Sequence, residues 1–317
     1  MSPTSSPSTG RPQVAYVVPD RLNTPQADPN DTDYAKQWDL FEATAGMNVP
    51  AAWPTSTGSG VTVAVIDTGY VAHSDLAANI VGGYDFIADT AVSVDGDGRD
   101  SNPADPGDWY NAASAAPASR PATPPGTART WPAPSPPSPT TARAWRHRVR
   151  REDLPGARAR QVRRLRLRHH RRHHLASGGT VSGVPANSNV AKVINMSLGG
   201  DGACTSATQS AINAAVNRGT TIAVAAGNDN DNVANHSPGN CNNVISVAAT
   251  NRTGAKASYS NYGSLVDISA PGGQTSTGTA NGIYSTLNSG TRTPSTESYA
   301  YYRAPAWPPR TSRASSR

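Results

Sequence analysis

The run Val61–Ile66 constrains the fold more than any other stretch of the chain. Its residues are apolar and mostly β-branched, apart from Thr62, which is typical of a strand buried on both faces of a parallel sheet. The run ends abruptly on Asp67, which Thr68 and Gly69 follow. A carboxylate at the carboxyl end of a buried parallel strand lies where open α/β sheets place their functional residues. Asp67 is therefore the first candidate site residue.

Further apolar runs, separated by turn residues, predict more strands. They are Ile80–Ile87, Val193–Leu198, Thr221–Ala225, Asn243–Thr250 and Val266–Ala270. Between the second and third of these, Ser206–Arg218 has a helical pattern, with Ser206 and Gln209 resembling a capping box and Gly219 ending the helix. This alternation predicts an α/β fold with a mostly parallel sheet that is covered on both faces.

The basic residues are concentrated in two stretches. Residues 111–176 contain 15 arginines and two acids, and residues 303–317 contain four more arginines and no acid. Removing both stretches from the 28 basic and 22 acidic residues of the chain leaves 9 and 20, a net charge of −11. The net charge of +6 for the whole chain therefore does not by itself indicate a nucleic-acid-binding protein.

An acidic loop follows the second predicted strand and is a candidate metal site. Its carboxylates are Asp95, Asp97, Asp100, Asp105 and Asp108. Carboxylate oxygens are the ligands that Ca²⁺ prefers, although no Glu closes a twelve-residue loop as in an EF-hand. The alternative is a solvated acidic turn.

The two cysteines, Cys204 and Cys241, allow one extracellular disulfide or two buried free thiols. No stretch has the length and apolarity of a transmembrane helix, and the first residues lack the apolar stretch of a signal peptide.

Several strings in one fixed order resemble the subtilisin-like serine proteases of secreted bacterial type. They are VAVIDTG at 63–69, INMSLGG at 194–200, VAAGNDN at 224–230, ASYSNYG at 257–263 and DISAPGG at 267–273. Residues 29–38, PNDTDYAKQW, resemble the start of the mature enzyme and predict an ordered arm with an aromatic anchor. Val14–Asp20 resembles the last strand of the inhibitory propeptide of these enzymes.

This resemblance implies a three-layer α/β/α fold and hydrolysis of peptide bonds through an acyl-enzyme, with Asp67 as the triad acid and Asn228 as the oxyanion-hole side chain. Ser197, Leu198 and Gly199 are expected to bind the substrate backbone and form one wall of its specificity pocket. The resemblance further implies secretion, bound calcium and a monomer acting on protein or peptide substrates, with no nucleic-acid or membrane partner. The structural alternatives are a strand-end cap for Asp67, a turn residue for Asn228 and plain strand and turn for 197–199.

The family motifs that carry the catalytic histidine and serine, H-G-T-H-V-A-G-T and G-T-S-M-A-x-P-H-V-A-G, are missing from this sequence. His73, six residues after Asp67, resembles the structural H-x-D-L element of the family, and His236 lies in a surface-type loop. The other histidines lie in the Arg-rich stretch without a motif around them: His147, His169, His170, His173 and His174.

A shift of reading frame accounts for both missing motifs. Most residues of the basic stretches fix the first two bases of their codons and leave the third free. Shifted by one base, the codons of residues 303–316 permit G-T-S-M-A-A-P-H-V-A-G-V, and those of residues 126–141 permit H-G-T-H-V-A-G-T-V. In the remaining frame, residues 156–175 permit an apolar strand and an amphipathic helix that continue into Ala176. The rival explanation is a natural Arg-rich insertion.

The sequence thus predicts a peptidase domain in two parts, residues 29–110 and 176–302. Residues 1–28 form a disordered start with a propeptide remnant, and residues 111–175 and 303–317 are out-of-frame, irregular segments. The expected function is that of a subtilisin-like endopeptidase, with activity lost in the chain as written because base and nucleophile are absent. The alternatives are a peptide-binding pseudo-protease and nucleic-acid binding through the Arg-rich segment.

Overall fold

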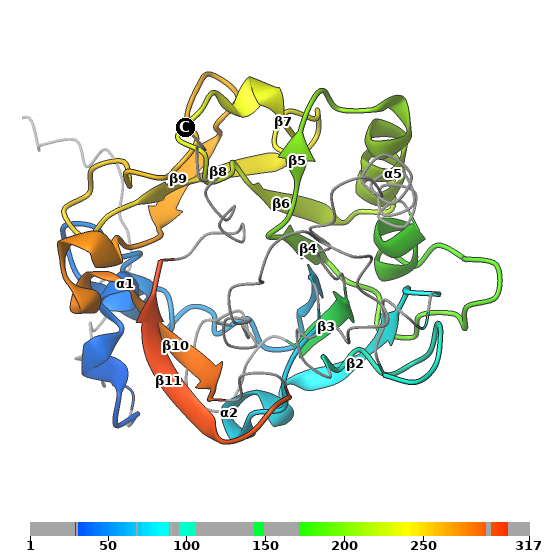
Figure 1. Ribbon diagram of the computed structural model, residues 1–317, viewed down its shortest axis with the longest axis horizontal. Helices are drawn as coiled ribbons and strands as arrows, with labels where there is room; N and C mark the ends of the chain where they lie inside the picture. Colours follow the sequence, from blue (N-terminus) through cyan, green and yellow to red (C-terminus); the bar gives the residue numbers. More distant parts are fainter. Residues whose placement is uncertain are drawn as a thin grey trace, which may run out of the picture.

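The computed structural model describes residues 29, 31–67, 69–88, 90, 95–105, 171–289 and 293–303, and the backbone of 143–148. In this part of the chain the central sheet contains seven strands, in the order β2-β3-β1-β4-β6-β8-β9 (Figure 1). Their bounds are β1 Thr62–Ile66, β2 Ile80–Asp85, β3 Arg143–Arg148, β4 Val193–Met196, β6 Thr221–Ala225, β8 Ile245–Thr250 and β9 Ile268–Pro271. Each pairing between neighbours in this sheet is parallel, which confirms the α/β class with a parallel central sheet.

Two small antiparallel sheets complete the strands of the described residues. One is the pair β5 Gly200–Asp201 and β7 His236–Ser237, and the other is the hairpin of β10 Ile283–Asn288 and β11 Glu297–Tyr302. Among the described residues the α-helices include α1 Trp38–Phe41, α2 Ser74–Ala77 and α5 Ser206–Asn217, and residues 171–176 are also helical. Short 3₁₀ turns lie at Tyr34–Lys36, Val49–Ala51, Val233–Asn235, Thr275–Thr277 and Thr279–Asn281.

The main core lies between the sheet and helix α5. Alternate residues of the central strands point into it, which is the two-residue period of a β-strand. The buried members from β1, β4 and β6 are Ala64, Ile66, Ile194, Met196, Ile222 and Val224. Ile212 and Ala215 pack against them from α5, because residues three apart share one face of a helix. In β1 the residues between the buried ones are half-buried, so the described structure covers one face of this strand more fully than the other.

Helix α5 begins at Ser206, as the sequence pattern predicts, but its N-cap is a different residue. The N-cap is Thr205, whose side chain accepts a hydrogen bond of 3.2 Å from the amide of Thr208. The expected capping box at Ser206 and Gln209 is therefore wrong. Gln209 instead holds the loop beyond Cys241, donating to the carbonyl of Asn242 and accepting from its amide.

The expectation that residues 111–175 are irregular is wrong at two places. Strand β3 occupies the slot between β1 and β2, and residues 171–176 are helical. A strand edge offers backbone donors and acceptors that pair with any extended segment, whatever its side chains. The helical Arg172 is fully buried, with its guanidinium 5.9 Å from the ring centre of Phe86. The rest of 111–175, residues 1–28 and the tail after Arg303 lie outside the described residues.

The predicted aromatic anchor of the N-terminal arm is confirmed. Trp38 is fully buried, and its indole N–H donates to the carbonyl of Gly282 at 2.7 Å. Tyr284 reinforces this contact, since its hydroxyl donates to Asp33 at 2.8 Å. Arg252 binds Glu42 through its guanidinium. The start of the described chain is thus held by residues from its last quarter (Figure 1).

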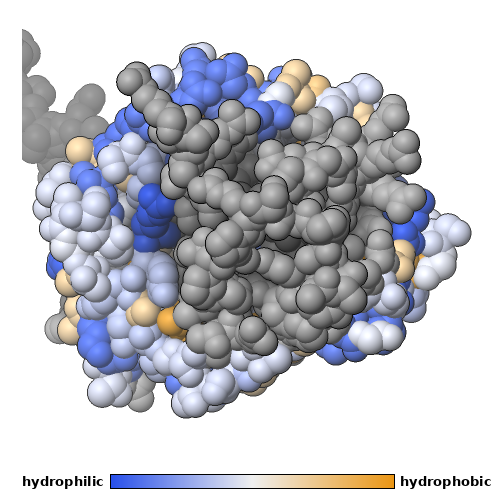
Figure 2. All heavy atoms as spheres, in the orientation of Figure 1, coloured by the Kyte–Doolittle hydropathy of each residue, from blue (hydrophilic) through white to orange (hydrophobic). Residues whose placement is uncertain are grey.

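The described surface in Figure 2 is largely polar, and its apolar side chains are scattered rather than gathered into one patch. Among the described residues, no helix is long and apolar enough to cross a membrane.

Cys204 and Cys241 form a disulfide, with Cα atoms 5.2 Å apart and a sequence separation of 37. Replacing both with Ser is expected to lower the free energy of unfolding by about 2–4 kcal/mol, because the cross-link restricts the unfolded chain. Urea denaturation under oxidising conditions measures this loss. In excess reductant the variant and the parent chain should unfold at the same urea concentration, and equal midpoints without reductant would contradict the prediction.

Burial raises the pKa of Asp39 to about 6, because the carboxylate loses its hydration next to Trp38. A carboxyl group with a raised pKa in the folded state favours folding when protonated, so its contribution is complete below about pH 4 and is lost as the pH rises through 6. Asp39→Asn should therefore stabilise the protein at pH 8, by up to about 3 kcal/mol, and change little at pH 4. Thermal or urea unfolding at both pH values checks this. An equal effect at the two pH values would show that charge is not the cause.

Candidate active site

Three predicted site segments follow three neighbouring parallel strands. Asp67 follows β1 directly, Ser197 follows β4 directly, and Asn228 comes three residues after β6. Because β1, β4 and β6 are adjacent and parallel, their carboxyl ends lie at one edge of the sheet (Figure 1). The sheet therefore brings the three segments to the same edge, which is where open α/β sheets bind ligands.

Asp67 is a buried carboxylate on a fixed backbone. It is 4% exposed, and Ile66 before it is fully buried. Gly69 has a φ of 130°, a conformation that favours glycine, so the chain can turn sharply after the strand. The residue after Gly69 is fixed by a distant segment, because the amide of Asp105 donates a hydrogen bond to the carbonyl of Tyr70 at 2.8 Å. The end of the acidic loop thus fixes the exit of the strand that carries Asp67.

Asn228 lies on a loop that the buried side chain of Asn261 holds in place. Asn261 donates to the carbonyl of Ala226 at 3.0 Å, and its side-chain oxygen accepts the amides of Asp229 at 2.8 Å and Asp231 at 3.1 Å. A Cβ at Gly227 would collide with this side chain. The backbone on both sides of Asn228 is therefore positioned by one amide group that is fully buried.

The sequence patterns alone indicate no role for Asn261. Asn261 lies in the string ASYSNYG, which carries part of the family resemblance. Nothing in that string indicates that its side chain contacts a loop some 30 residues earlier. A buried Asn with three of its hydrogen-bonding positions used is a positioning residue for this loop.

Ser197, Leu198 and Gly199 are half-buried and belong to none of the described β-ladders. The hydroxyl of Ser197 accepts a hydrogen bond of 3.1 Å from Asn195, and Leu198 packs against the main core. The segment then continues into β5, which pairs with β7. This leaves 197–199 at the sheet edge, between β4 and the β5–β7 pair.

His73 has a structural task. It is 4% exposed, and its Nδ1 accepts the amide N–H of Asp75 at 3.2 Å, which caps the start of α2. Its ring packs edge-on against Tyr299, with centroids 5.0 Å apart. These contacts support its interpretation as a structural histidine.

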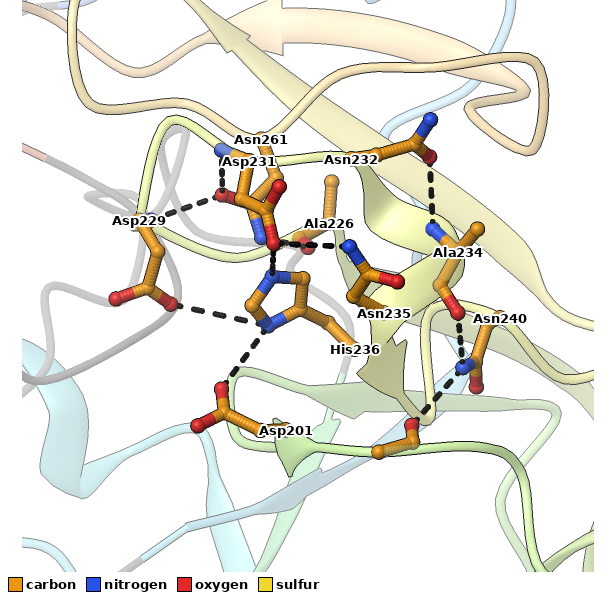
Figure 3. Close-up of polar contacts among 11 residues, drawn as sticks. Asp201, Ala226, Asp229, Asp231, Asn232, Ala234, Asn235, His236, Asn240 and Asn261 are labelled. Atoms are coloured by element: carbon orange, nitrogen blue, oxygen red, sulfur yellow. Dashed lines mark hydrogen bonds and ion pairs between the residues drawn. The ribbon is translucent and has the colours of Figure 1, made fainter.

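His236 does not lie in a surface-type loop, and that expectation is wrong. It is 4% exposed, because β7 pairs with β5 and three aspartates surround its ring (Figure 3). Of the histidines in the Arg-rich stretch, His173 is buried in the helical residues 171–176. Burial and the neighbouring Arg218 lower the pKa of His174. His147 is described by its backbone alone, and His169 and His170 lie outside the described residues.

The structure brings together part of the predicted acidic site. Asp97 interacts with Asp95 and Asp100, and its pKa is raised by desolvation and by the repulsion of these two carboxylates. The amide of Asp97 donates to Asp95 at 3.4 Å. Asp105 is 7% exposed and its backbone pairs with Tyr70, while Asp108 lies outside the described residues.

The disulfide joins helix α5 to the segment that follows the loop of Asn228. Cys204 precedes helix α5, and Cys241 follows the turn that begins at His236. It therefore ties the start of the helix to the segment that comes after Asn228.

Comparison with known proteins agrees with the sequence strings and the sheet. A model of the subtilase family matches residues 174–304. An extracellular protease of Xanthomonas campestris pv. campestris is 48% identical over 297 residues, which is 92% of this chain and 49% of the relative. The chain thus spans about half the length of that curated relative.

Two further likenesses cover most of the known protein. Thermitase of Thermoactinomyces vulgaris is 33% identical over 227 residues, covering 71% of this chain and 68% of thermitase. A solved structure of a protease from Pseudoalteromonas arctica is 44% identical with a TM-score of 0.73, covering 87% of this chain and 82% of that one. With the parallel sheet and the ordered strings around Asp67 and Asn228, these likenesses show that the chain belongs to the subtilase family of subtilisin-like serine proteases.

Proposed function

We propose that this chain carries the framework of a secreted serine endopeptidase that cleaves proteins or peptides through an acyl-enzyme. Asp67 is the triad acid, Asn228 stabilises the oxyanion, and 197–199 bind the substrate backbone. The observation that carries the proposal is the meeting of these segments at the ends of β1, β4 and β6. The parallel register of the three strands supports it, because the register fixes the order of the segments along one edge.

The environment of each group suits its proposed role. A buried carboxylate such as Asp67 can hold an imidazole in one tautomer and stabilise the imidazolium that forms during catalysis. The side-chain amide of Asn228 is a neutral donor carried on a backbone that Asn261 fixes, which suits a group that must stabilise a developing oxyanion. The half-buried backbone groups at 197–199 belong to no ladder of the described residues, which suits pairing with an extended peptide.

The chain as printed lacks the imidazole base and the serine nucleophile of the family. We therefore propose that it does not cleave peptides, and that its two basic stretches are out-of-frame readings of a gene for an active relative. The limits of the family match give support: it begins at residue 174, where the Arg-rich stretch ends, and stops at residue 304, where the basic tail begins. Without base and nucleophile, only the weak catalysis of the oxyanion hole and substrate binding remains.

Two other functions receive less support. A peptide-binding pseudo-protease would keep the edge at 197–199 and needs no catalytic residue. Nucleic-acid binding would use the Arg-rich segment as a free basic arm, but the backbone of 143–148 is paired within the sheet on both sides.

We also propose that the protein acts as a monomer.

Calcium fits the acidic loop by the chemistry of its donors. Three carboxylates, Asp95, Asp97 and Asp100, repel each other in one turn, and a bound cation would remove that repulsion. The same loop ends at Asp105, which holds the backbone just after Asp67. A cation there would supply rigidity to the segment that carries the proposed acid, and no chemical step.

A fluorophosphonate probe, which labels activated serines, tests the proposed activity. The 317-residue chain should remain unlabelled, whereas a chain with residues 126–175 and 303–317 re-read in the shifted frames should be labelled. In that repaired chain, Asp67→Asn should lower kcat about 10⁴-fold, and Asn228→Ala about 10²–10³-fold.

Clear labelling of the printed chain would refute the loss of activity. Peptides from residues 126–175 in the mass spectrum of the native protein, together with an uninterrupted gene, would refute the frame shift. A cooperative thermal melt with saturable peptide binding by the printed chain would support the pseudo-protease instead, and a flat melt would exclude it.

Calcium should raise the melting temperature, because an ion that binds only the folded chain stabilises it by about 2.7 kcal/mol at a hundred times its Kd. Asp97→Asn should remove most of this gain, since Asp97 contacts both neighbouring carboxylates. The matched control is Asp31→Asn, the same exchange at an exposed aspartate outside the acidic loop. Equal calcium effects in parent and Asp97→Asn chains, or a loss confined to the control, would contradict the assignment.

A further inference from the structure

A buried histidine stands among three aspartates beside the proposed substrate segment (Figure 3). The side chain of His236 is 5% exposed. Its Nε2 lies 3.0 Å from Asp231, and its Nδ1 lies 3.4 Å from Asp201 and 3.8 Å from Asp229. No role for this cluster follows from the family resemblance or from the proposed catalytic groups.

Backbone hydrogen bonds, rather than charge, bring these residues together. Asp201 and His236 are opposite partners in the β5–β7 ladder. The amides of Asp229 and Asp231 both donate to the buried side chain of Asn261. The fold therefore holds three carboxylates around one ring although they repel each other, which is a cost that a bound cation would offset.

The hydrogen bond to Asp231 selects one tautomer of the ring. One oxygen of the Asp231 carboxylate has two partners: the side-chain amide of Asn235 donates to it at 3.1 Å, and Nε2 of His236 lies 3.0 Å from it. In neutral imidazole the proton then sits on Nε2, and Nδ1 is left with a lone pair. A carboxylate that receives the distal N–H of a histidine is the usual outer partner of metal-ligating imidazoles.

Within the described part of the chain, Nδ1 itself is buried and has no hydrogen-bond partner. Its lone pair faces an oxygen of Asp201 and an oxygen of Asp229, so three acceptors point at one another. A cation satisfies such an arrangement, either as a proton on Nδ1 or as a metal ion between the three atoms.

We propose that Asp201, Asp229 and His236 form a binding site for a divalent transition-metal ion, zinc being the best fit, with Asp231 as the residue that orients the imidazole. Zinc is commonly held by imidazole nitrogen and carboxylate oxygen, whereas calcium takes oxygen ligands alone.

The distances suit one small ion. Two ligand atoms on a tetrahedral zinc, each about 2.1 Å from it, are separated by about 3.4 Å. The Nδ1–Asp201 distance is 3.4 Å and the Nδ1–Asp229 distance 3.8 Å, and all three ligand atoms lie within 4.8 Å of one another. The carboxylates are 57% and 30% exposed, so they can close on an ion, and a fourth position stays open to water.

The site would join two loops of the candidate active site. Asp229 directly follows Asn228, and Asp201 lies two residues after Gly199. An ion bound between them would clamp the proposed oxyanion loop to the proposed substrate edge. The proposal concerns binding alone and does not depend on peptidase activity.

Isothermal titration of the full chain, purified without a histidine tag, with zinc chloride tests the site. Cobalt(II) is a second probe, because its visible absorption is strong when its coordination is tetrahedral. Asp201→Asn and Asp229→Asn should each abolish the strong event in the titration. Asp231→Asn should weaken it about 10–100-fold, as expected for an outer-shell partner. Asp31→Asn, at an exposed aspartate outside both proposed metal sites, is the matched control and should change nothing.

These variants separate the site from weak binding by other histidines of the chain. Zinc binding that is unchanged in both Asp201→Asn and Asp229→Asn would overturn the proposal. So would a nuclear magnetic resonance titration in which excess zinc leaves the Nδ1 signal of His236 unmoved, since the cluster then holds a proton only. This measurement uses the parent chain and keeps the test decisive if a variant fails to fold. A zinc-dependent shift of that signal, lost in Asp201→Asn, would support it.

Discussion

The ladder on both sides of β1 is the constraint on which the candidate site depends. β1 pairs in parallel with β3 on one side and with β4 on the other, and β4 pairs in turn with β6. Because these pairings fix the register, a carboxylate directly after β1 has one position relative to the ends of its neighbours. Catalytic geometry in such a sheet is set mainly by backbone hydrogen bonds, and the side chains at the strand ends only need to be of the right chemical type.

The loop after β6 shows a second way of fixing positions. Asn261 reaches it from a later segment and binds Ala226, Asp229 and Asp231 at once. An amide can donate and accept simultaneously, so one buried side chain replaces several backbone contacts that an irregular loop lacks. The proposed oxyanion donor and the cluster around His236 therefore share one support, and a change at Asn261 would disturb both.

Local patterns were sufficient to predict the elements that carry the site. The β-branched run before Asp67, the strand at Thr221–Ala225 and the anchor at Trp38 all lie where the sequence places them. These predictions are confirmed because the hydrophobic period, the strand or helix propensity and the turn residues all indicate the same element over a short stretch of sequence.

Contacts between distant segments could not be predicted in the same way. The burial of His236 depends on β5, which lies some 35 residues earlier in the sequence. The role of Asn261 depends on its contact with a loop some 30 residues away. Strand β3 has an Arg-rich sequence without a strand pattern, and it is a strand because two neighbouring edges supply partners. Pairing with distant segments overrode local propensity there.

The anchor of Trp38 on Gly282 has a consequence for biosynthesis. A ribosome makes the arm first, but its partners Arg252, Gly282 and Tyr284 emerge more than 200 residues later. Until then the indole lacks the carbonyl that accepts its hydrogen bond, so the native anchor cannot form earlier in synthesis. The contacts that fasten the arm to the hairpin therefore require translation to have passed residue 284.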